Sequence, residues 1–304
     1  VDATGLPSGN AVSGERLCSA HRSQQCVTDG RGRIGERCRH RVALHHGMGH
    51  SAAMSADLLE AAAAAVADAR RIVVLTGAGI STDSGIPDFR GPNGLWTKNP
   101  AAEKASKLEH YLSDPEVRAV AWQNRLHTPA WTAEPNDGHR AIVELETQGR
   151  LHALVTQNID GLHQKAGTDP ERVIEVHGTV WWTRCWECDD RRAMAETLER
   201  VRAGEVDPPC VVCGGILKSD TISFGQALVP EVIDRALSVS EECDVLLAVG
   251  STLSVFPAAN CVPRAKAAGA QVVIVNGDST AMDRYADWLL LGQIADILPA
   301  LVTS

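Results

Sequence analysis

Five short apolar runs, separated mostly by stretches of helical character, constrain the fold of this 304-residue chain more than any other feature. Each run has the length and composition of a buried strand. Strands that alternate with helices predict a parallel sheet, and the carboxyl ends of such strands form a ligand crevice. We therefore expect an α/β fold with a doubly wound, Rossmann-like parallel sheet and a nucleotide site. The runs are 72–75, 151–156, 173–176, 244–249 and 271–275, and the small or polar residues at their ends include Gly77, Gln157, His177, Gly250 and Asn276.

The composition is that of an ordinary globular protein, with 44% hydrophobic and 22% charged residues. No apolar run reaches the roughly 18 residues of a membrane helix, and the first residues lack the pattern of an export signal. We therefore expect a cytoplasmic protein without a membrane partner. The net charge of −9 argues against a protein that binds nucleic acid through contacts to its phosphates.

Residues 1–53 differ from the rest of the chain. Gly, Ser, Arg and His dominate this stretch, aromatic residues are absent, and no helical or strand period persists. A helix is expected over 55–70, directly after Met54. We expect residues 1–53 to be a disordered tail or an over-extended reading frame, and residues 54–304 to form the folded domain. N-terminal sequencing of the native protein would test this.

The turn after the first strand reads Gly77-Ala78-Gly79, followed by Ser81 and Thr82. Glycines let the backbone approach a ligand and expose amides to phosphate, and a following helix N-terminus adds positive charge. The third glycine of the dinucleotide fingerprint is missing. On these residues alone, a tight turn without a ligand is an equal alternative.

The second and third strands end in side chains suited to recognition and catalysis. Gln157, Asn158 and Asp160 flank Ile159, and their amide and carboxylate groups could recognise an amide and a sugar together. His177 is the candidate general base, because its ordinary pKa of about 6.5 lies near working pH. A structural histidine is the alternative.

The last two strands end in further candidate contacts for a nucleotide. Gly250-Ser251-Thr252 offers donors to a phosphate or ribose, or a helix cap. Asn276-Gly277-Asp278 offers an acidic side chain to ribose hydroxyls, or an ordinary Asn-Gly turn. As members of a set of strand ends, both segments favour the ligand interpretation.

Two Cys-x-x-Cys pairs form the most specific local motif. Four thiolates in two such knuckles match the ligands of one tetrahedral Zn²⁺ ion. No open ligand position is implied, so we expect a structural ion, with redox or buried cysteine pairs as the weaker alternative. The residues are Cys185, Cys188, Cys210 and Cys213.

Together these motifs resemble those of the sirtuins, a family of NAD-dependent protein-lysine deacylases. The resemblance runs from about residue 55 to the end of the chain and omits residues 1–53. The matching segments follow one another in the family's order: Gly77-Ala78-Gly79-Ile80-Ser81, Ile86-Pro87-Asp88-Phe89-Arg90, Gln157-Asn158-Ile159-Asp160, His177-Gly178, the four cysteines, Phe224-Gly225 and Asn276.

The resemblance implies a set of NAD-binding residues. Those facing the pyrophosphate would be Gly77, Ala78 and Gly79, with Ser81, Thr82 and Arg90 nearby. Asp88, Phe89 and Arg90 would belong to a loop that closes over the nicotinamide end. Ile159 and Asp160 would hold the nicotinamide carboxamide, and Asn158, beside Gln157, the adjacent ribose. The adenosine side would be lined by Gly250, Ser251, Thr252, Asn276, Gly277, Asp278 and Ile294.

The resemblance also implies acyl transfer rather than hydride transfer. The acyl oxygen of a modified lysine would displace nicotinamide from the ribose. This would leave an imidate that joins the lysine to the ribose. His177, the catalytic base assisted by Asn158, would then help a ribose hydroxyl attack the imidate carbon, and water would yield free lysine and O-acyl-ADP-ribose. The acylated peptide would lie as an extra strand between 222–226 and 254–256. Its contacts would include Ile222, Phe224, Gly225 and Val255.

The chain departs from the family's common pattern near this peptide groove. Ser219, Ser223 and Gln226 stand where Pro, Phe and Glu are common. Sirtuins that remove succinyl groups carry Tyr-x-x-Arg, whereas the nearest match here is Trp122-Gln-Asn-Arg125, so we expect neutral acyl groups to be favoured.

The predicted domain division follows from these motifs. A Rossmann-like core would comprise 54–97, 134–178 and 219–304, interrupted by a helical insert at about 98–133 and a zinc module at about 179–218. Two other functions stay open at this point: protein mono-ADP-ribosyl transfer at the same site, and a non-enzymatic NAD- or zinc-binding interaction protein. The presence of His177 argues against the non-enzymatic function, because a binding protein needs no general base.

Overall fold

The computed structural model of the chain describes residues 51–88, 94, 104 and 106–303. All of them belong to one compact unit, Arg41–Ser304. Most of the predicted tail, and Phe89 and Arg90 of the predicted cofactor loop, lie outside the described residues. The first helix, α1 (Ser51–Asp68), begins three residues before Met54.

Six parallel strands form the central sheet, in the order β3-β2-β1-β7-β8-β9. The five predicted strands are all present, which confirms the parallel α/β fold. The sixth, β9, was missed by the sequence analysis, since its four residues are too few for a period and only one of them is buried. The strands are β1 (Ile72–Thr76), β2 (Leu151–Thr156), β3 (Val173–Glu175), β7 (Val245–Val249), β8 (Gln271–Asn276) and β9 (Trp288–Leu291).

The register of the sheet brings the strand ends to one edge. Thr76 of β1 pairs with Thr156 of β2 on one side and with Val249 of β7 on the other, and Val249 pairs with Val275 of β8. The chain order also reverses between β1 and β7, because β2 and β3 extend the sheet one way and β8 and β9 the other. Ligands of open α/β sheets bind at such a reversal point.

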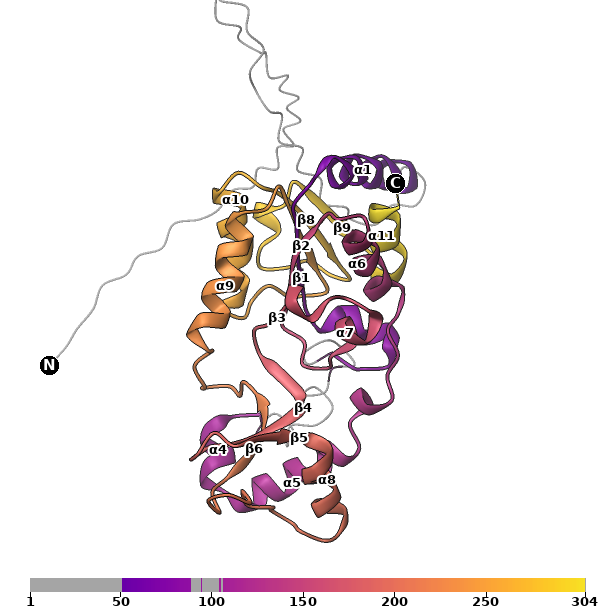
Figure 1. Ribbon diagram of the computed structural model, residues 1–304. Coiled ribbons are helices and arrows are strands. Elements are labelled where there is room, and N and C mark those ends of the chain that lie inside the picture. The colour runs from indigo at the N-terminus through magenta and orange to yellow at the C-terminus, as the bar shows by residue number, and fades with distance from the viewer. Residues whose placement is uncertain (1–50, 89–93, 95–103, 105, 304) are drawn as a thin grey trace, which may run out of the picture. The chain divides into compact units, whose positions relative to one another are not determined.

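Helices cover both faces of this sheet (Figure 1). In β1 the buried side chains alternate: Ile72 and Val74 pack on one side, and Val73 and Leu75 on the other. The first face is covered by α1, α6 (Asp137–Thr147) and α11 (Ile294–Val302), and the second by α9 (Pro230–Glu241) and α10 (Cys261–Ala267). Short helical segments connect the rest: η1 (Ala78–Ser84), η2 (Pro129–Trp131), α7 (Leu162–Ala166), η3 (Pro170–Arg172), η4 (Ala258–Asn260) and η5 (Asp283–Tyr285).

A second, antiparallel sheet carries the cysteines, in the order β5-β4-β6. Its strands are β4 (Gly178–Cys185), β5 (Arg191–Ala193) and β6 (Leu217–Thr221). A charged helix, α8 (Met194–Arg202), lies between the two cysteine pairs. Since β6 runs to Thr221, the small sheet extends three residues past the predicted boundary at 218; the domain boundaries stay a prediction.

The predicted helical insert packs against this small sheet. It contains α4 (Leu108–Ser113) and α5 (Pro115–Leu126). Trp122 of α5 is fully buried in one cluster with Cys185, Cys210 and Leu217. The Tyr111 hydroxyl of α4 donates to the Leu217 carbonyl at 2.8 Å. The insert and the cysteine module therefore share one hydrophobic core, although they lie far apart in the sequence.

Among the described residues, no helix combines the length and the apolarity needed to cross a lipid bilayer.

Candidate active site

The loop after β1 is held by the loop after β7. The Gly77 amide donates to the Val249 carbonyl at 3.0 Å, and the Gly79 amide donates to the Gly250 carbonyl at 2.8 Å. The glycine pattern predicts that the amides of this loop bind phosphate. The structure gives these two amides partners within the protein, so the contact of the loop with NAD stays a prediction.

The glycines are required by close backbone packing. A Cβ atom at Gly77 would lie 2.7 Å from the Gly250 oxygen, and one at Gly79 would lie 2.8 Å from the Gly250 Cα. Gly250 itself has a φ of 64°, in the left-handed region that favours glycine. The spacing Gly-x-Gly therefore reflects the fit of two loops at the reversal point of the sheet.

A buried hydrogen-bond network joins this loop to the end of β2. The Ser81 hydroxyl donates to Asp160 Oδ2 at 2.8 Å. Asn158 Nδ2 lies 3.1 Å from the Gly77 carbonyl and 3.2 Å from Ser81 Oγ. Burial raises the pKa of Asp160, while its hydrogen bonds from the Leu162 amide and Ser81 act in the opposite direction. The sheet thus gathers the predicted contacts for the nicotinamide end.

The predicted adenosine-side residues are only partly gathered. Gln157 Nε2 donates to Ser251 Oγ at 2.9 Å, which links β2 to β7. Asn276 Nδ2 donates to the Asp278 carbonyl at 2.8 Å, as the turn interpretation of Asn276-Gly277 predicts. Ile294 starts α11 and is only 8% exposed within the hydrophobic core. Thr252, which follows β7, is exposed, as is Thr82 of η1 on the predicted pyrophosphate side.

His177 follows β3 and contacts the same edge. Its Nδ1 lies 3.0 Å from the Gln157 carbonyl oxygen. A carbonyl can only accept, so Nδ1 carries the proton and Nε2 keeps its lone pair. Burial lowers the pKa of His177, and the hydrogen bond to Gln157 acts against that shift. The imidazole is therefore held as a neutral base, the state that the sequence analysis requires of it.

The predicted peptide-binding segment, 222–226, is hydrogen-bonded to the backbone of His177. The Ile222 amide donates to the His177 carbonyl at 2.8 Å. The Phe224 amide and carbonyl bond to Ser106 and Leu108, at 2.9 Å each. An added peptide strand would therefore have to use other groups of this segment. The Phe224 ring is 43% exposed, and Gly225 has a φ of 85°.

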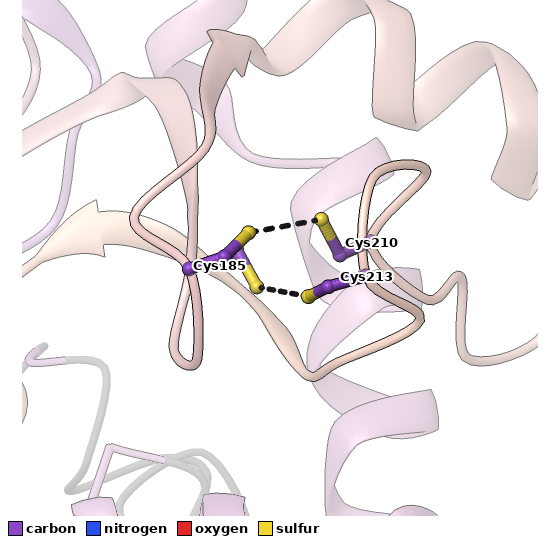
Figure 2. Close-up of side chains that lie close together, drawn as sticks. Cys185, Cys210 and Cys213 are labelled. Atoms are coloured by element: carbon purple, nitrogen blue, oxygen red, sulfur yellow. Dashed lines mark hydrogen bonds between the residues drawn. The ribbon is translucent and has the colours of Figure 1, made fainter.

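The four cysteines converge as predicted. Their Sγ atoms all lie within 4.8 Å of one another, with 3.4 Å between Cys185 and Cys213 and 3.7 Å between Cys188 and Cys210 (Figure 2). These separations far exceed the roughly 2.05 Å of a disulfide. Four sulfurs bound to one Zn²⁺ at about 2.3 Å are about 3.8 Å apart, so the geometry fits the ion.

Backbone amides also point at these sulfurs. The Val212 amide donates to Cys210 Sγ and the Gly215 amide to Cys213 Sγ, both at 3.4 Å. Such donors stabilise the thiolate form that a metal ion needs. Cys185 and Cys210 lie in the core shared with α5 and α8, whereas Cys188 and Cys213 are exposed. The residues can thus hold one structural zinc ion.

Comparison with known proteins identifies the family. A family model described as the Sir2 family matches residues 77–257. The chain belongs to the Sir2 family. A Streptomyces coelicolor protein named NAD-dependent protein deacetylase 2 is 47% identical over 231 residues, or 76% of this chain and 96% of that protein. The similarity therefore spans nearly the whole of this relative.

Solved Sir2 structures share the fold as well. One, from a study of the mechanism and regulation of Sir2 enzymes, has a TM-score of 0.73 and 38% identity, covering 81% of this chain and 96% of its own. Another, of Sir2 with a p53 peptide and NAD+, has a TM-score of 0.70 and 31% identity, covering 77% and 93%. The sirtuin resemblance is thereby confirmed.

A chain of buried polar residues that the sequence did not predict adjoins Asn158. Thr76 Oγ1 lies 2.8 Å from Thr156 Oγ1 and 3.0 Å from His163 Nε2, and Thr156 Oγ1 accepts from the Asn158 amide. His163 in turn lies 4.9 Å, centroid to centroid, from His139. Through the Thr156 hydroxyl, this buried polar chain holds the backbone amide of Asn158 in place. Its members lie inside apolar strands or helices, where no local pattern distinguishes them from core residues.

Proposed function

We propose that this Sir2-family chain is an NAD-dependent protein-lysine deacetylase, which transfers the acyl group to ADP-ribose and releases nicotinamide. Curated relatives named NAD-dependent protein deacetylase support this, at 47% and 40% identity. A solved relative, 30% identical with a TM-score of 0.73, is a Sir2 variant with a deacetylated p53 peptide and 3'-O-acetyl ADP-ribose. The substrates would be acylated lysine side chains of proteins or peptides.

The observation that carries the proposal is the state of His177. Its Nδ1 is bonded to the Gln157 carbonyl, which leaves Nε2 able to take a proton. Gln157 begins the segment that holds Asn158 and Asp160 against the glycine loop. A base placed beside amide- and hydroxyl-recognising groups suits removal of a proton from a ribose hydroxyl.

The other site residues would bind and orient NAD, which supplies the electrophilic ribose carbon. Asn158, Ile159 and Asp160 would position its nicotinamide end, and the loops at Gly77 and Gly250 its pyrophosphate and adenosine. Asp88, with Phe89 and Arg90, would belong to the closing loop. The assignments of the strand ends are supported by the common edge of β1, β2 and β7 and by the hydrogen bonds that join their ends, whereas the closing loop is assigned from the sequence resemblance alone.

The zinc ion would act through structure alone. All four possible ligands are cysteines of the small module. Cys210 Sγ accepts from the Val212 amide and Cys213 Sγ from the Gly215 amide, so the turn that carries these two sulfurs also orients them. The ion would join the two turns without touching the base. We also propose a cytoplasmic location and a preference for neutral acyl groups, both carried over from the sequence.

The test uses the full chain with NAD and an acetyl-lysine peptide. A deacetylase releases nicotinamide in step with O-acetyl-ADP-ribose and free lysine. Transfer of label from NAD onto protein, without loss of acetyl groups, would instead identify a mono-ADP-ribosyltransferase. Binding of NAD without release of nicotinamide would reject both enzymes and leave a binding protein.

A further inference from the structure

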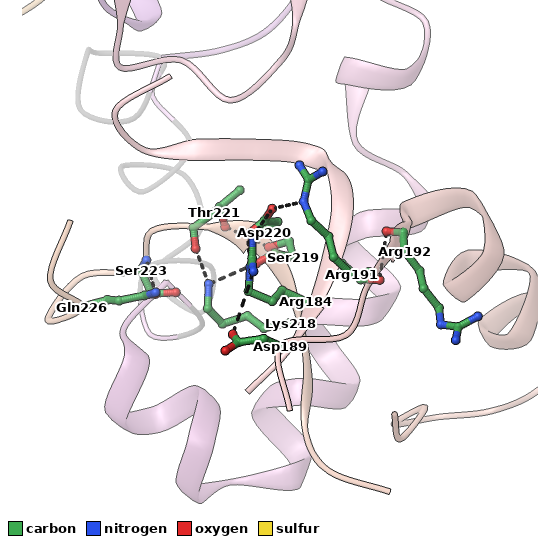
Figure 3. A network of polar contacts seen from close by, with 11 residues as sticks. Arg184, Asp189, Arg191, Arg192, Lys218, Ser219, Asp220, Thr221, Ser223 and Gln226 are labelled. Carbon is green, nitrogen blue, oxygen red and sulfur yellow. Dashed lines mark hydrogen bonds and ion pairs between the residues drawn. The ribbon is translucent and has the colours of Figure 1, made fainter. Parts of the chain in front are cut away.

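Lys218, the second residue of β6, is buried, which is unusual for a lysine side chain. Its exposed fraction is 4%. The Nζ atom donates to the Ser219 carbonyl at 3.1 Å and to the Thr221 carbonyl (Figure 3). A buried ammonium has to be compensated by acceptors, and here the acceptors are backbone oxygens just ahead of the predicted peptide segment.

Both polar groups of the peptide unit between Thr221 and Ile222 are hydrogen-bonded. The carbonyl of the Thr221–Ile222 unit accepts from Lys218, and its amide donates to the His177 carbonyl at 2.8 Å. Gly178, next to His177, pairs with Thr221. A Cβ atom at Gly178 would collide with the Asp220 carbonyl, so the two strands approach each other closely here. The position of Ile222 relative to the base thus depends on this unit.

We propose that Lys218 is a positioning residue that clamps the Thr221–Ile222 peptide unit and so sets the distance between the acyl-peptide seat and His177. The proposal rests on the proposed function, because it assigns the peptide seat to Ile222. Lys218 itself touches no reacting atom. Its ammonium acts through the backbone, whereas an aliphatic side chain of similar size would fill the space without holding the carbonyls.

Charged groups from three neighbouring elements surround Lys218. Arg125 of α5 donates to Ser219 Oγ at 3.2 Å. Asp220, on β6, is already paired with Arg184 of β4 at 2.8 Å and with Arg191 of β5 at 2.6 Å (Figure 3). Burial, and then the charge of Arg125, lower the pKa of Lys218 to about 7, against the attraction of Asp220. The clamp would therefore be strongest below this pH and weaken above it, as the ammonium loses its proton.

The direct test is hydrogen exchange at the Ile222 amide in Lys218→Met. Methionine keeps the length of the side chain and removes the donors. Because hydrogen bonds from ionised donors are the stronger class, we expect Ile222 to exchange about tenfold faster. Lys165→Met is the matched control: Lys165 Nζ also donates to a backbone carbonyl, that of Ala133 at 2.7 Å, but in another part of the structure. It should leave Ile222 unchanged.

Catalysis supplies the second readout. Lys218→Met should raise the KM for the acetylated peptide about tenfold, with the KM for NAD unchanged, and Lys218→Arg should restore part of the loss. In the native chain the peptide KM should rise as pH increases through about 7. In Lys218→Met this rise should be absent.

Unchanged protection of Ile222 in Lys218→Met would overturn the clamp. If that variant does not fold, the native chain decides: intrinsic-rate-corrected protection of Ile222 that stays flat from pH 6 to pH 9 overturns it as well. Exchange needs neither NAD nor turnover. If the native chain does not deacetylate the peptide, the proposed function is rejected. If Ile222 still loses its protection in Lys218→Met, the clamp stands even so.

Discussion

Replacing Gly79 with alanine tests the tight contact between the loops after β1 and β7. The added Cβ would lie 2.8 Å from Gly250 Cα and 2.9 Å from Gly250 O. Both are backbone atoms, so no flexible side chain can move aside. The loops must separate by about half an ångström to reach ordinary van der Waals distance, which also lengthens the 2.8 Å bond from the Gly79 amide to the Gly250 carbonyl.

Overpacking of this kind costs about 1–3 kcal/mol. In a domain of this size each kcal/mol lowers Tm by roughly 2–4 °C, so Gly79→Ala should melt roughly 2–12 °C below the native chain. The KM for NAD should rise as well, since the loop that faces the predicted pyrophosphate position is displaced. Thermal unfolding followed by circular dichroism gives the first quantity, and initial rates at varied NAD give the second.

Gly277→Ala is the matched control at a neighbouring strand end. A Cβ at Gly277 has no heavy atom within 4 Å, and its φ lies outside the left-handed region. This substitution should change the free energy of unfolding by less than about 0.5 kcal/mol, or stabilise the chain slightly. If Gly79→Ala is as stable as Gly277→Ala, the conclusion that the two loops pack too closely to admit a Cβ atom is wrong.

Three further predictions concern the base, the zinc ion and the buried carboxylate. Because the pKa of His177 is lowered, kcat/KM should fall on the acid side only below about pH 6.5, and a pH–rate profile with its acid limb above that value would contradict the assignment. Removal of zinc by a chelator should unfold the module that contains Cys185, with loss of one zinc per chain by atomic absorption; an unchanged melting curve after metal loss would reject the structural role. Ser81→Ala should cost about 1.5–3 kcal/mol in urea unfolding, because it removes a hydrogen bond to the buried Asp160 carboxyl, and a cost near zero would show that another donor replaces it.

The sequence predicted the parallel sheet because its strands are short, apolar and bounded by polar or small residues. Once strands are parallel and in register, their ends must meet, so the proximity of Gly77, Gln157 and Gly250 follows from chain pattern alone. The cysteine cluster could be predicted for a similar reason, since the spacing of each pair matches a metal knuckle. These features depend on local chemistry.

Features that depend on contacts between distant segments could not be predicted. Trp122 and Tyr111 belong to a polar helical stretch. Nothing in that stretch shows that Trp122 shares a core with Cys185, or that the Tyr111 hydroxyl bonds to the Leu217 carbonyl. The partner of the Gly79 amide is Gly250, more than 150 residues away. Lys218 reads as a surface residue because lysine is almost never buried, and only its backbone acceptors reveal its setting.

The role of His177 is tested most directly by His177→Ala in the full chain. The peptide carbonyl that receives the Ile222 amide belongs to the backbone and survives this change. The variant should keep the melting temperature and NAD affinity of the native chain. It should lose formation of O-acetyl-ADP-ribose by about 10²–10⁴-fold, the usual contribution of a general base. A folded variant that still produces O-acetyl-ADP-ribose at near the native rate would contradict the assignment of His177 as the base.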